Sequence, residues 1–240
     1  MKKIRQLLTA SLGLPAYLRL VSYSYIQLVR LGLMRKAYPE LYYLKHLVNP
    51  GDVVIDIGAN VGYYSVMLSQ RCGLSGKVYS VEPVPLFAGI FSSNMQRFAL
   101  PNYELLPFAL GSSEQEITMT TPVVNGVFRH GLTHIASADE ATNAYQYKVK
   151  MKIPDQLFSN LSRLDFVKCD VEGYEAILLP SFIKTISKFK PTLQIEIGTS
   201  ENRDAILELL QPIGYKIYQL HENSLVEGFQ HQTADYYFKA

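Results

Sequence analysis

The stretch Val53–Ser65, which reads VVIDIGANVGYYS, constrains the fold more than any other part of this chain. Its β-branched apolar start is typical of a strand buried on both faces of a sheet. A turn containing Gly58, Asn60 and Gly62 follows and leads into a segment of helical character. Glycine and asparagine tolerate positive φ, and a turn with little side chain lets backbone N–H groups approach a ligand. A strand, a glycine turn and a helix N-terminus together predict a site for a nucleoside-containing cofactor.

Composition indicates one sizeable folded domain with an appendage. The chain has 240 residues, of which 48% are hydrophobic and 18% are charged, so it can bury a core and does not belong to the disordered class. Cys72 and Cys169 are too few for a disulfide framework and are expected as buried thiols in a reducing compartment. The sequence contains no Cys/His cluster with zinc spacing.

Charge divides the chain into two parts. Residues 1–50 hold eight Lys/Arg and a single acid, Glu40, whereas residues 51–240 hold 15 Lys/Arg and 20 Asp/Glu. A basic, apolar segment on a mildly acidic body fits an anionic membrane surface or partner better than a nucleic acid. An aromatic-basic RNA-binding signature is absent from the sequence. We therefore expect no nucleic-acid partner and treat residues 1–50 as a helical, basic extension.

The N-terminal extension has two interpretations. Residues 1–14 resemble a signal peptide only superficially, because the apolar run is short, and Arg19 and Arg30 argue against a membrane span further on. Either the helix over residues 15–33 packs on the core and acts as a lid, or residues 1–36 contact a membrane surface. The expected location is cytoplasmic, with or without peripheral contact with the inner face of the membrane. The residues expected on the buried stripe of this helix are Leu18, Val21, Tyr25, Leu28 and Val29.

The remaining chain alternates between strand and helix patterns, which predicts an α/β fold with a mostly parallel sheet and right-handed crossovers. After the first strand, we expect strands over residues 77–82, 103–110, 117–121, 148–153, 164–170, 192–197, 215–220 and 235–239. We expect helices over residues 38–48, 63–71, 87–98, 156–161, 176–189 and 203–210. Asp155 is the expected N-cap of the helix over 156–161, and Pro180 should kink or break the helix over 176–189 near its start.

A polar, aperiodic stretch over residues 122–147 is expected to be a long loop that is either functional or disordered. It contains His130 and His134, which are candidate general bases because imidazole titrates near neutrality. A single histidine in a loop is more often simply solvated.

Acids follow the expected strands at the edge where parallel strands bind ligands. They are Asp56, Glu82, Asp170 and Glu196, with Glu172 just beyond the third of them. Glu82 lies 20 positions after Gly62, where a carboxylate can accept hydrogen bonds from both ribose hydroxyls of an adenosine-type ligand. These acids predict a catalytic site for a nucleoside cofactor.

Four segments in this order resemble the FkbM-type S-adenosylmethionine-dependent methyltransferases. They are DIGANVGYYS at residues 56–65, VEP at residues 81–83, KCDVEGYE at residues 168–175 and the Pro-x-x-x-x-Glu strand at residues 191–196. The resemblance covers residues 51–240, and residues 1–50 and 122–147 lie outside its pattern. It implies the class I methyltransferase fold, a Rossmann-like sheet of seven strands in which the last, near residues 235–239, is antiparallel. The chain departs from the family at Cys169, where an aliphatic residue is usual, and at Pro180-Ser181, where Gly-Ala is common.

The resemblance implies S-adenosylmethionine as cofactor and, as reaction, O-methylation of a hydroxyl on a small molecule, a sugar or a lipid-linked acceptor. The expected cofactor-binding residues are Asp56, Gly58, Asn60, Gly62, Glu82, Pro83, Ala109 and Asp170. The expected catalytic residues are Asp170 and Glu172, with His134 and His130 as reserve bases. An alternative use of Asp170, Glu172 and Glu196 is to bind a divalent metal, because related metal-dependent O-methyltransferases place acids at these strand ends.

Two other functions compete with methyl transfer. An NAD-type oxidoreductase on a related fold would carry Gly-x-Gly-x-x-Gly, whereas three residues without glycine separate Gly58 from Gly62. A non-catalytic S-adenosylmethionine-binding module at a membrane surface would not need the pair Asp170 and Glu172.

Overall fold

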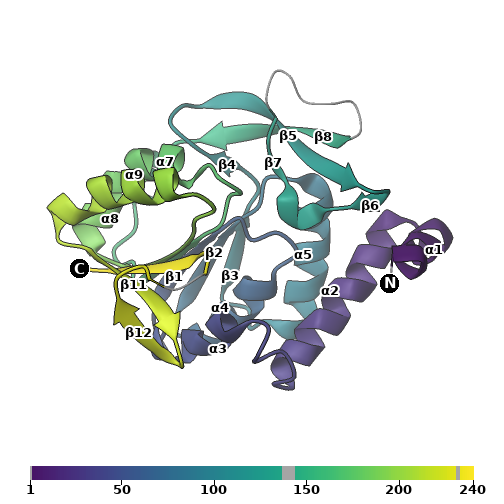
Figure 1. The fold of residues 1–240 in the computed structure, drawn as a ribbon, viewed down its shortest axis with the longest axis horizontal. Helices are drawn as coiled ribbons and strands as arrows, with labels where there is room; N and C mark the ends of the chain where they lie inside the picture. The colour runs from purple at the N-terminus through teal and green to yellow at the C-terminus, as the bar shows by residue number, and fades with distance from the viewer. Residues whose placement is uncertain (1, 137–143, 231–232) are drawn as a thin grey trace.

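Eight strands form one large twisted sheet in the computed structural model, which describes residues 2–136, 144–230 and 233–240 (Figure 1). Its order is β12-β11-β13-β10-β9-β1-β2-β3. The strands are β1 (Val53–Ile57), β2 (Lys77–Val81), β3 (Tyr103–Leu106), β9 (Phe166–Cys169), β10 (Thr192–Glu196), β11 (Lys216–His221), β12 (Ser224–Glu227) and β13 (Asp235–Lys239). Neighbouring strands along the order β10-β9-β1-β2-β3 are parallel, and β13 is antiparallel to both β10 and β11. The predicted mostly parallel sheet with an antiparallel last strand is therefore confirmed.

The sheet has eight strands where seven were expected, because a hairpin adds β12 at its edge. Glu222 and Asn223 connect β11 to β12 and have φ values of 45° and 69°. Two successive residues with positive φ form the type of tight turn that suits a two-residue hairpin. Glu222-Asn223 lacks the glycine that usually indicates such a turn, so the sequence analysis did not predict the hairpin.

Helices cover both faces of the large sheet (Figure 1). On one face lie α2 (Leu14–Arg30), α3 (Pro39–Tyr43), α4 (Tyr63–Cys72) and α5 (Pro85–Phe98). On the other face lie α7 (Glu175–Leu178), α8 (Ile183–Phe189) and α9 (Ser200–Leu210). The largest apolar cluster joins α7–α9 to β1, β9 and β10, and a second joins α2 and α4 to the opposite side of β1. The predicted free, buried Cys72 and Cys169 are confirmed.

A second sheet of five strands lies beside the carboxyl ends of the large sheet (Figure 1). It contains β4 (Ala109–Leu110), β5 (Gln115–Val124), β6 (Val127–Phe128), β7 (His134–Ile135) and β8 (Ala144–Lys152). The prediction of a long loop over residues 122–147 is wrong for the described part of that stretch, and residues 137–143 lie outside the described residues. The strand expected over residues 103–110 is also wrong, because it divides around Pro107 into β3 and β4, which belong to different sheets.

The N-terminal segment forms α1 (Lys2–Leu12) and α2, and α2 packs on α5. The prediction of its buried stripe was partly wrong: Leu18 and Val29 are buried, but Val21 and Leu28 are exposed and Tyr25 is half-buried. The buried side instead includes Ser22 and Ile26. The side-chain amide of Asn94 donates to Ser22 Oγ at 3.0 Å, which satisfies a hydroxyl inside this contact.

Three smaller predictions can be compared with the structure, and two of them change. The helix expected over residues 38–48 is α3 followed by a short 3₁₀ turn, η1 (Leu44–His46). Residues 175–189 divide into α7, η3 (Leu179–Phe182) and α8, as expected from Pro180. Asp155 does not cap α6 (Pro154–Leu157), because its carboxylate accepts from the backbone N–H groups of Lys184 and Thr185 at 3.1 and 2.8 Å. It therefore stabilises the start of α8.

No helix in the described part of the chain is long and apolar enough to cross a membrane.

Candidate active site

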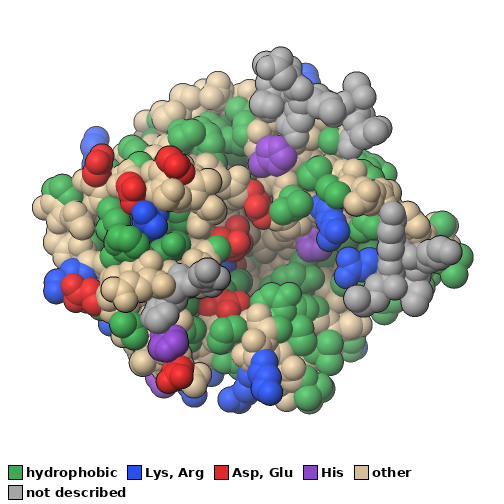
Figure 2. Space-filling model, viewed as in Figure 1, with side chains coloured by type: hydrophobic (Ala, Val, Ile, Leu, Met, Phe, Trp, Pro, Cys, Tyr) green, Lys and Arg blue, Asp and Glu red, His purple; other side chains and the backbone are tan. Residues whose placement is uncertain are grey.

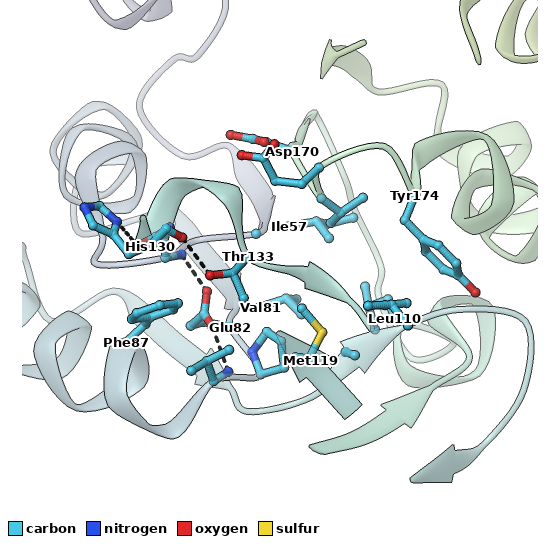
Figure 3. Close-up of a pocket in the computed structure, with 18 of the residues that line it drawn as sticks. Ile57, Val81, Glu82, Phe87, Leu110, Met119, His130, Thr133, Asp170 and Tyr174 are labelled. Atoms are coloured by element: carbon cyan, nitrogen blue, oxygen red, sulfur yellow. Dashed lines mark hydrogen bonds between the residues drawn. The ribbon is translucent and has the colours of Figure 1, made fainter. Parts of the chain in front are cut away.

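A cavity lies at the carboxyl ends of β1, β2 and β9, beneath the second sheet (Figure 3). Eight of the predicted site residues line it: Gly58, Asn60, Glu82, Pro83, Ala109, His130, Asp170 and Glu172. Sequence reasoning missed several apolar lining residues, which come from α5, the second sheet and the start of α7, among them Phe87, Met119, Ile135 and Tyr174. Asp56, Gly62, His134 and Glu196 do not line this cavity.

The turn after β1 requires glycine at its first position. Gly58 has a φ of 82°, and a Cβ there would overlap the backbone carbonyl of Asp170 on the neighbouring turn. The backbone N–H groups of Gly58 and Ala59 donate to the carbonyl of Val81 at 3.1 and 3.0 Å, which joins this turn to the end of β2. The ends of three strands are thereby held close enough to enclose one cavity.

Glu82 is buried at the end of β2 and holds the next part of the turn. Its Oε2 accepts from the Asn60 N–H at 2.8 Å, and its Oε1 accepts from the Val84 N–H at 2.7 Å (Figure 3). Burial raises the pKa of Glu82 to about 8, although both of these hydrogen bonds act in the opposite direction. Each carboxylate oxygen has a second lone pair, so Glu82 can still accept two hydrogen bonds from a ligand in the cavity.

His130 closes one side of the cavity by binding Asn60. The backbone carbonyl of His130 accepts from Asn60 Nδ2 at 3.2 Å, and its ring Nδ1 lies 3.1 Å from Asn60 Oδ1 (Figure 3). Asn60 has a φ of 49°, the left-handed region that asparagine adopts more readily than most residues. Burial, with a smaller contribution from Arg5, lowers the pKa of His130, so its imidazole is neutral at pH 7.

Asp56 belongs to a buried polar row that crosses the large sheet behind the cavity. Strand register places the members side by side, in the order Ser80, Asp56, Lys168, Gln194 and Tyr237. Ser65 of α4 donates to Asp56 Oδ2 at 2.5 Å. Burial raises the pKa of Asp56, opposed by the charge of Lys168 and by this hydrogen bond. Asp56 therefore lies behind the cavity rather than inside it.

Lys168 connects this row to the cavity. Its ammonium donates to Asp170 Oδ2 at 3.0 Å and lies 4.4 Å from the centre of the Tyr64 ring. A lysine inside an apolar strand is rarely buried unless it is paired. Lys168 could therefore have indicated a buried ion pair near the site, but the sequence analysis did not single it out. Its position fixes the Asp170 carboxylate at the mouth of the cavity.

The turn after β9 presents Glu172 to the cavity and uses Glu175 for support. Glu172 has a φ of 54°, which is uncommon for a residue other than glycine and often marks a functional site. Buried Glu175 accepts from the backbone N–H groups of Val171 and Gly173 at 3.0 and 3.2 Å. Burial, followed by the charges of Asp170 and Glu175, raises the pKa of Glu172 to about 7.

Further carboxylates on β10, β13 and α3 interact through their charges with Lys168, outside the lining of the cavity. Desolvation, then the charges of Asp170 and Asp235, raises the pKa of Glu196. Glu40 of α3 also has a pKa raised to about 7, mainly by burial. His134 of β7 lies close enough to Glu172 for its charge to lower that pKa, although it does not line the cavity.

The metal alternative is not supported by these positions. Within the described residues, Asp170, Glu172 and Glu196 do not form a metal-binding group, and neither do any other three His, Cys, Asp or Glu side chains. We therefore assign no step to a metal.

Comparison with known proteins places this geometry in context. The sequence profile of the methyltransferase FkbM domain matches residues 56–219. In sequence, the chain is 24% identical over 230 residues to the AMB antimetabolite synthetase AmbE of Pseudomonas aeruginosa, covering 79% of this chain and 11% of that protein. It is 38% identical over 48 residues to a protein-L-isoaspartate O-methyltransferase of Aeropyrum pernix, covering 20% of this chain and 18% of that protein.

Two solved structures share the fold. The methyltransferase FkbM of Methylobacillus flagellatus superposes with a TM-score of 0.53 and 15% identity, covering 81% of this chain and 49% of that chain. An S-adenosylmethionine-dependent O-methyltransferase of Thermotoga maritima gives a TM-score of 0.50 and 14% identity, covering 84% and 64% of the two chains. The chain thus spans about a tenth of the synthetase, about half of the first structure and under two thirds of the second.

Proposed function

The chain belongs to the FkbM methyltransferase family, and we propose that it transfers the methyl group of S-adenosylmethionine to a hydroxyl oxygen. The acceptor class that we propose is a small molecule, a sugar or a lipid-linked compound. The observation that carries the proposal is the cavity itself, which has Glu82 at one side, Asp170 at another and the Gly58 turn between them (Figure 3). This arrangement supports binding of a nucleoside beside Glu82 and chemistry beside Asp170.

The lining residues fit the two ends of the cofactor. Glu82 retains two acceptor positions for the ribose hydroxyls, and the apolar surface around Ala109 and Leu110 suits the adenine ring. The turn at Gly58 and Asn60 faces the methionine part, and the missing side chain at Gly58 lets the backbone carbonyl of Asp170 lie against this turn. Asp56 and Ser65 are buried behind this turn, between β1 and α4.

Asp170 is the residue that we propose as acceptor base. S-Adenosylmethionine supplies an electrophilic methyl group on a good leaving group, so the protein needs to orient the acceptor and remove its proton. The Asp170 carboxylate, held by Lys168, accepts the hydroxyl proton as the new oxygen–carbon bond forms. Glu172 binds a second hydroxyl of the acceptor. His130 is neutral and can serve as the reserve base, as can His134 near Glu172.

Calorimetry and product analysis together test this proposal. We expect the purified protein to bind S-adenosylmethionine but not NAD, and Glu82→Ala to weaken binding by about tenfold or more, since a charged hydrogen bond contributes about 1.5–3 kcal/mol. Cell extracts incubated with the protein and S-adenosylmethionine should gain products heavier by one methylene unit, which Asp170→Asn should abolish while binding of the cofactor persists. Preferential binding of NAD would overturn the proposal.

A further inference from the structure

The outer side of α2 is apolar although it faces solvent. Among the described residues, fifteen large hydrophobic side chains are exposed, and eight of them lie between Leu7 and Tyr38. The clearest examples are Leu20, Leu28 and Leu31, which are 49%, 40% and 71% exposed. Such a concentration differs from the scattered single residues of an ordinary protein surface and indicates an interaction site.

Helical geometry explains why these side chains remain uncovered. The buried side of α2 carries Leu18, Ser22, Ile26 and Val29 against the core. Leu20 and Leu28 are eight residues apart, so they share a face, and that face lies roughly opposite the buried one. The helix is therefore apolar on both sides, and packing on α5 covers only one of them.

The segment that carries this apolar surface contains basic residues and no acidic ones. Residues 1–39 contain seven Lys/Arg and no Asp or Glu. Arg19 and Arg30 are exposed on the flank of α2 between its buried and leucine faces, with Arg30 over the Phe98 ring of α5, and Arg35 and Lys36 are exposed in the turn that follows α2. We call this the α2 outer surface, comprising Leu20, Leu28, Leu31, Leu33 and the four basic residues just named.

We propose that the α2 outer surface docks on a phospholipid bilayer with anionic headgroups. Apolar side chains flanked by Lys and Arg are the composition of interfacial helices, in which leucines enter the acyl boundary and cations meet lipid phosphates. A second copy of the chain fits less well, because a symmetric contact would bring two acid-free, basic surfaces together.

Docking in this way would also bring the site to the bilayer surface. In Figure 2, hydrophobic side chains over α2 lie beside a central hollow, whose opposite side carries acidic side chains. A hydroxyl-bearing lipid headgroup could then reach the cavity without leaving the bilayer. This last step rests on the proposed methyl transfer, whereas docking itself does not.

Vesicle sedimentation with the full chain tests the docking. We expect binding to vesicles of phosphatidylglycerol and phosphatidylcholine in equal parts, and weak binding to phosphatidylcholine alone. The double variant Leu28→Gln/Leu31→Gln should lower the partition coefficient about tenfold or more, because burial of each leucine in lipid is lost. Its matched control is Leu74→Gln/Ile177→Gln, at residues 73% and 53% exposed elsewhere on the surface, which should bind as the unaltered chain does.

Variants of the basic residues measure the electrostatic contribution to vesicle binding. Arg19→Gln/Lys36→Gln should weaken binding to the anionic vesicles about tenfold or more, at about 1 kcal/mol per cation, whereas Lys150→Gln/Lys239→Gln should not. Equal binding of all variants, or no binding to anionic vesicles, would overturn the proposal. So would a stable dimer in sedimentation velocity that Leu28→Gln/Leu31→Gln dissociates. These readouts do not depend on enzymatic activity, so failure of docking and failure of the proposed function remain distinguishable.

Discussion

The ammonium of Lys168, which is only 3% exposed, lies 3.0 Å from the carboxylate of Asp170 at the mouth of the cavity. Burial alone would lower the pKa of Lys168, but the charges of Asp170, Asp56 and Asp235 outweigh it and raise that pKa. Lys168 thus interacts both with Asp56, behind the cofactor turn, and with Asp170, at the proposed reaction centre. The Lys168–Asp170 pair stabilises the fold and positions the proposed base.

Removal of this cation should destabilise the fold and misplace the base. Lys168→Met leaves Asp56 and Asp170 without their buried partner, which costs about 3–5 kcal/mol when one member of a buried pair is lost. Urea unfolding followed by circular dichroism measures this cost. Lys150→Met, an exposed position on β8, is the control and should change stability by less than about 0.5 kcal/mol. A Lys168→Met protein as stable as the control would contradict the role assigned to Lys168.

Two glycines should respond in opposite directions to alanine. At Gly58 a Cβ would meet the carbonyl of Asp170 and φ is 82°, so Gly58→Ala should destabilise by about 1–3 kcal/mol and abolish cofactor binding. At Gly89, within α5, no atom lies within 4 Å of the added Cβ, so Gly89→Ala should stabilise by about 0.5–1 kcal/mol. Thermal unfolding and calorimetry with S-adenosylmethionine provide both measurements. If Gly58→Ala and Gly89→Ala had similar effects on stability and binding, the close approach of the Asp170 carbonyl would not be what requires glycine at position 58.

The sequence predicted those parts of the site that depend on strand ends. Val53–Ile55 is apolar and β-branched, and the acids at or just after the ends of β1, β2 and β9 fall near one edge once the strands are parallel. Two such acids, Glu82 and Asp170, line one cavity in the structure. These placements follow from topology alone, since parallel strands bring their carboxyl ends together.

The parts that were missed depend on contacts between distant segments. The Asn60–His130 pair joins residues 70 positions apart, and it exists because β5 pairs with β8 to build the second sheet over the cavity. Residues 148–153 alternate as a strand does and were predicted as one, but such alternation does not reveal which strand is the partner. The buried stripe of α2 was misjudged for a similar reason, because Ser22 is buried through a hydrogen bond with Asn94 of another helix.

Stability should fall as the pH rises from acid to mildly alkaline. Burial raises the folded-state pKa of Glu82 to about 8 and that of Glu40 to about 7, from ordinary values of 4.5. The folded state therefore holds protons that the unfolded state has released, and stability decreases between about pH 4.5 and pH 8. Urea midpoints across this range measure the slope. Glu40→Gln should reduce it, whereas Glu208→Gln, exposed on α9, should not; an unaltered slope for Glu40→Gln would contradict the assignment.

Binding of S-adenosylmethionine should release protons near neutral pH. In the free protein the pKa of Glu82 is about 8, because the carboxylate is buried with only two hydrogen bonds. Ribose hydroxyls that donate to Glu82 favour its charged form and lower that pKa, so affinity should rise with pH up to about 8. Calorimetry in buffers of different ionisation enthalpy counts the released protons. Glu82→Gln should bind more weakly, with no proton release from this position, whereas Glu208→Gln should behave as the unaltered chain does. Equal proton release in Glu82→Gln would show that another carboxyl, such as Glu172, is the group that the cofactor titrates.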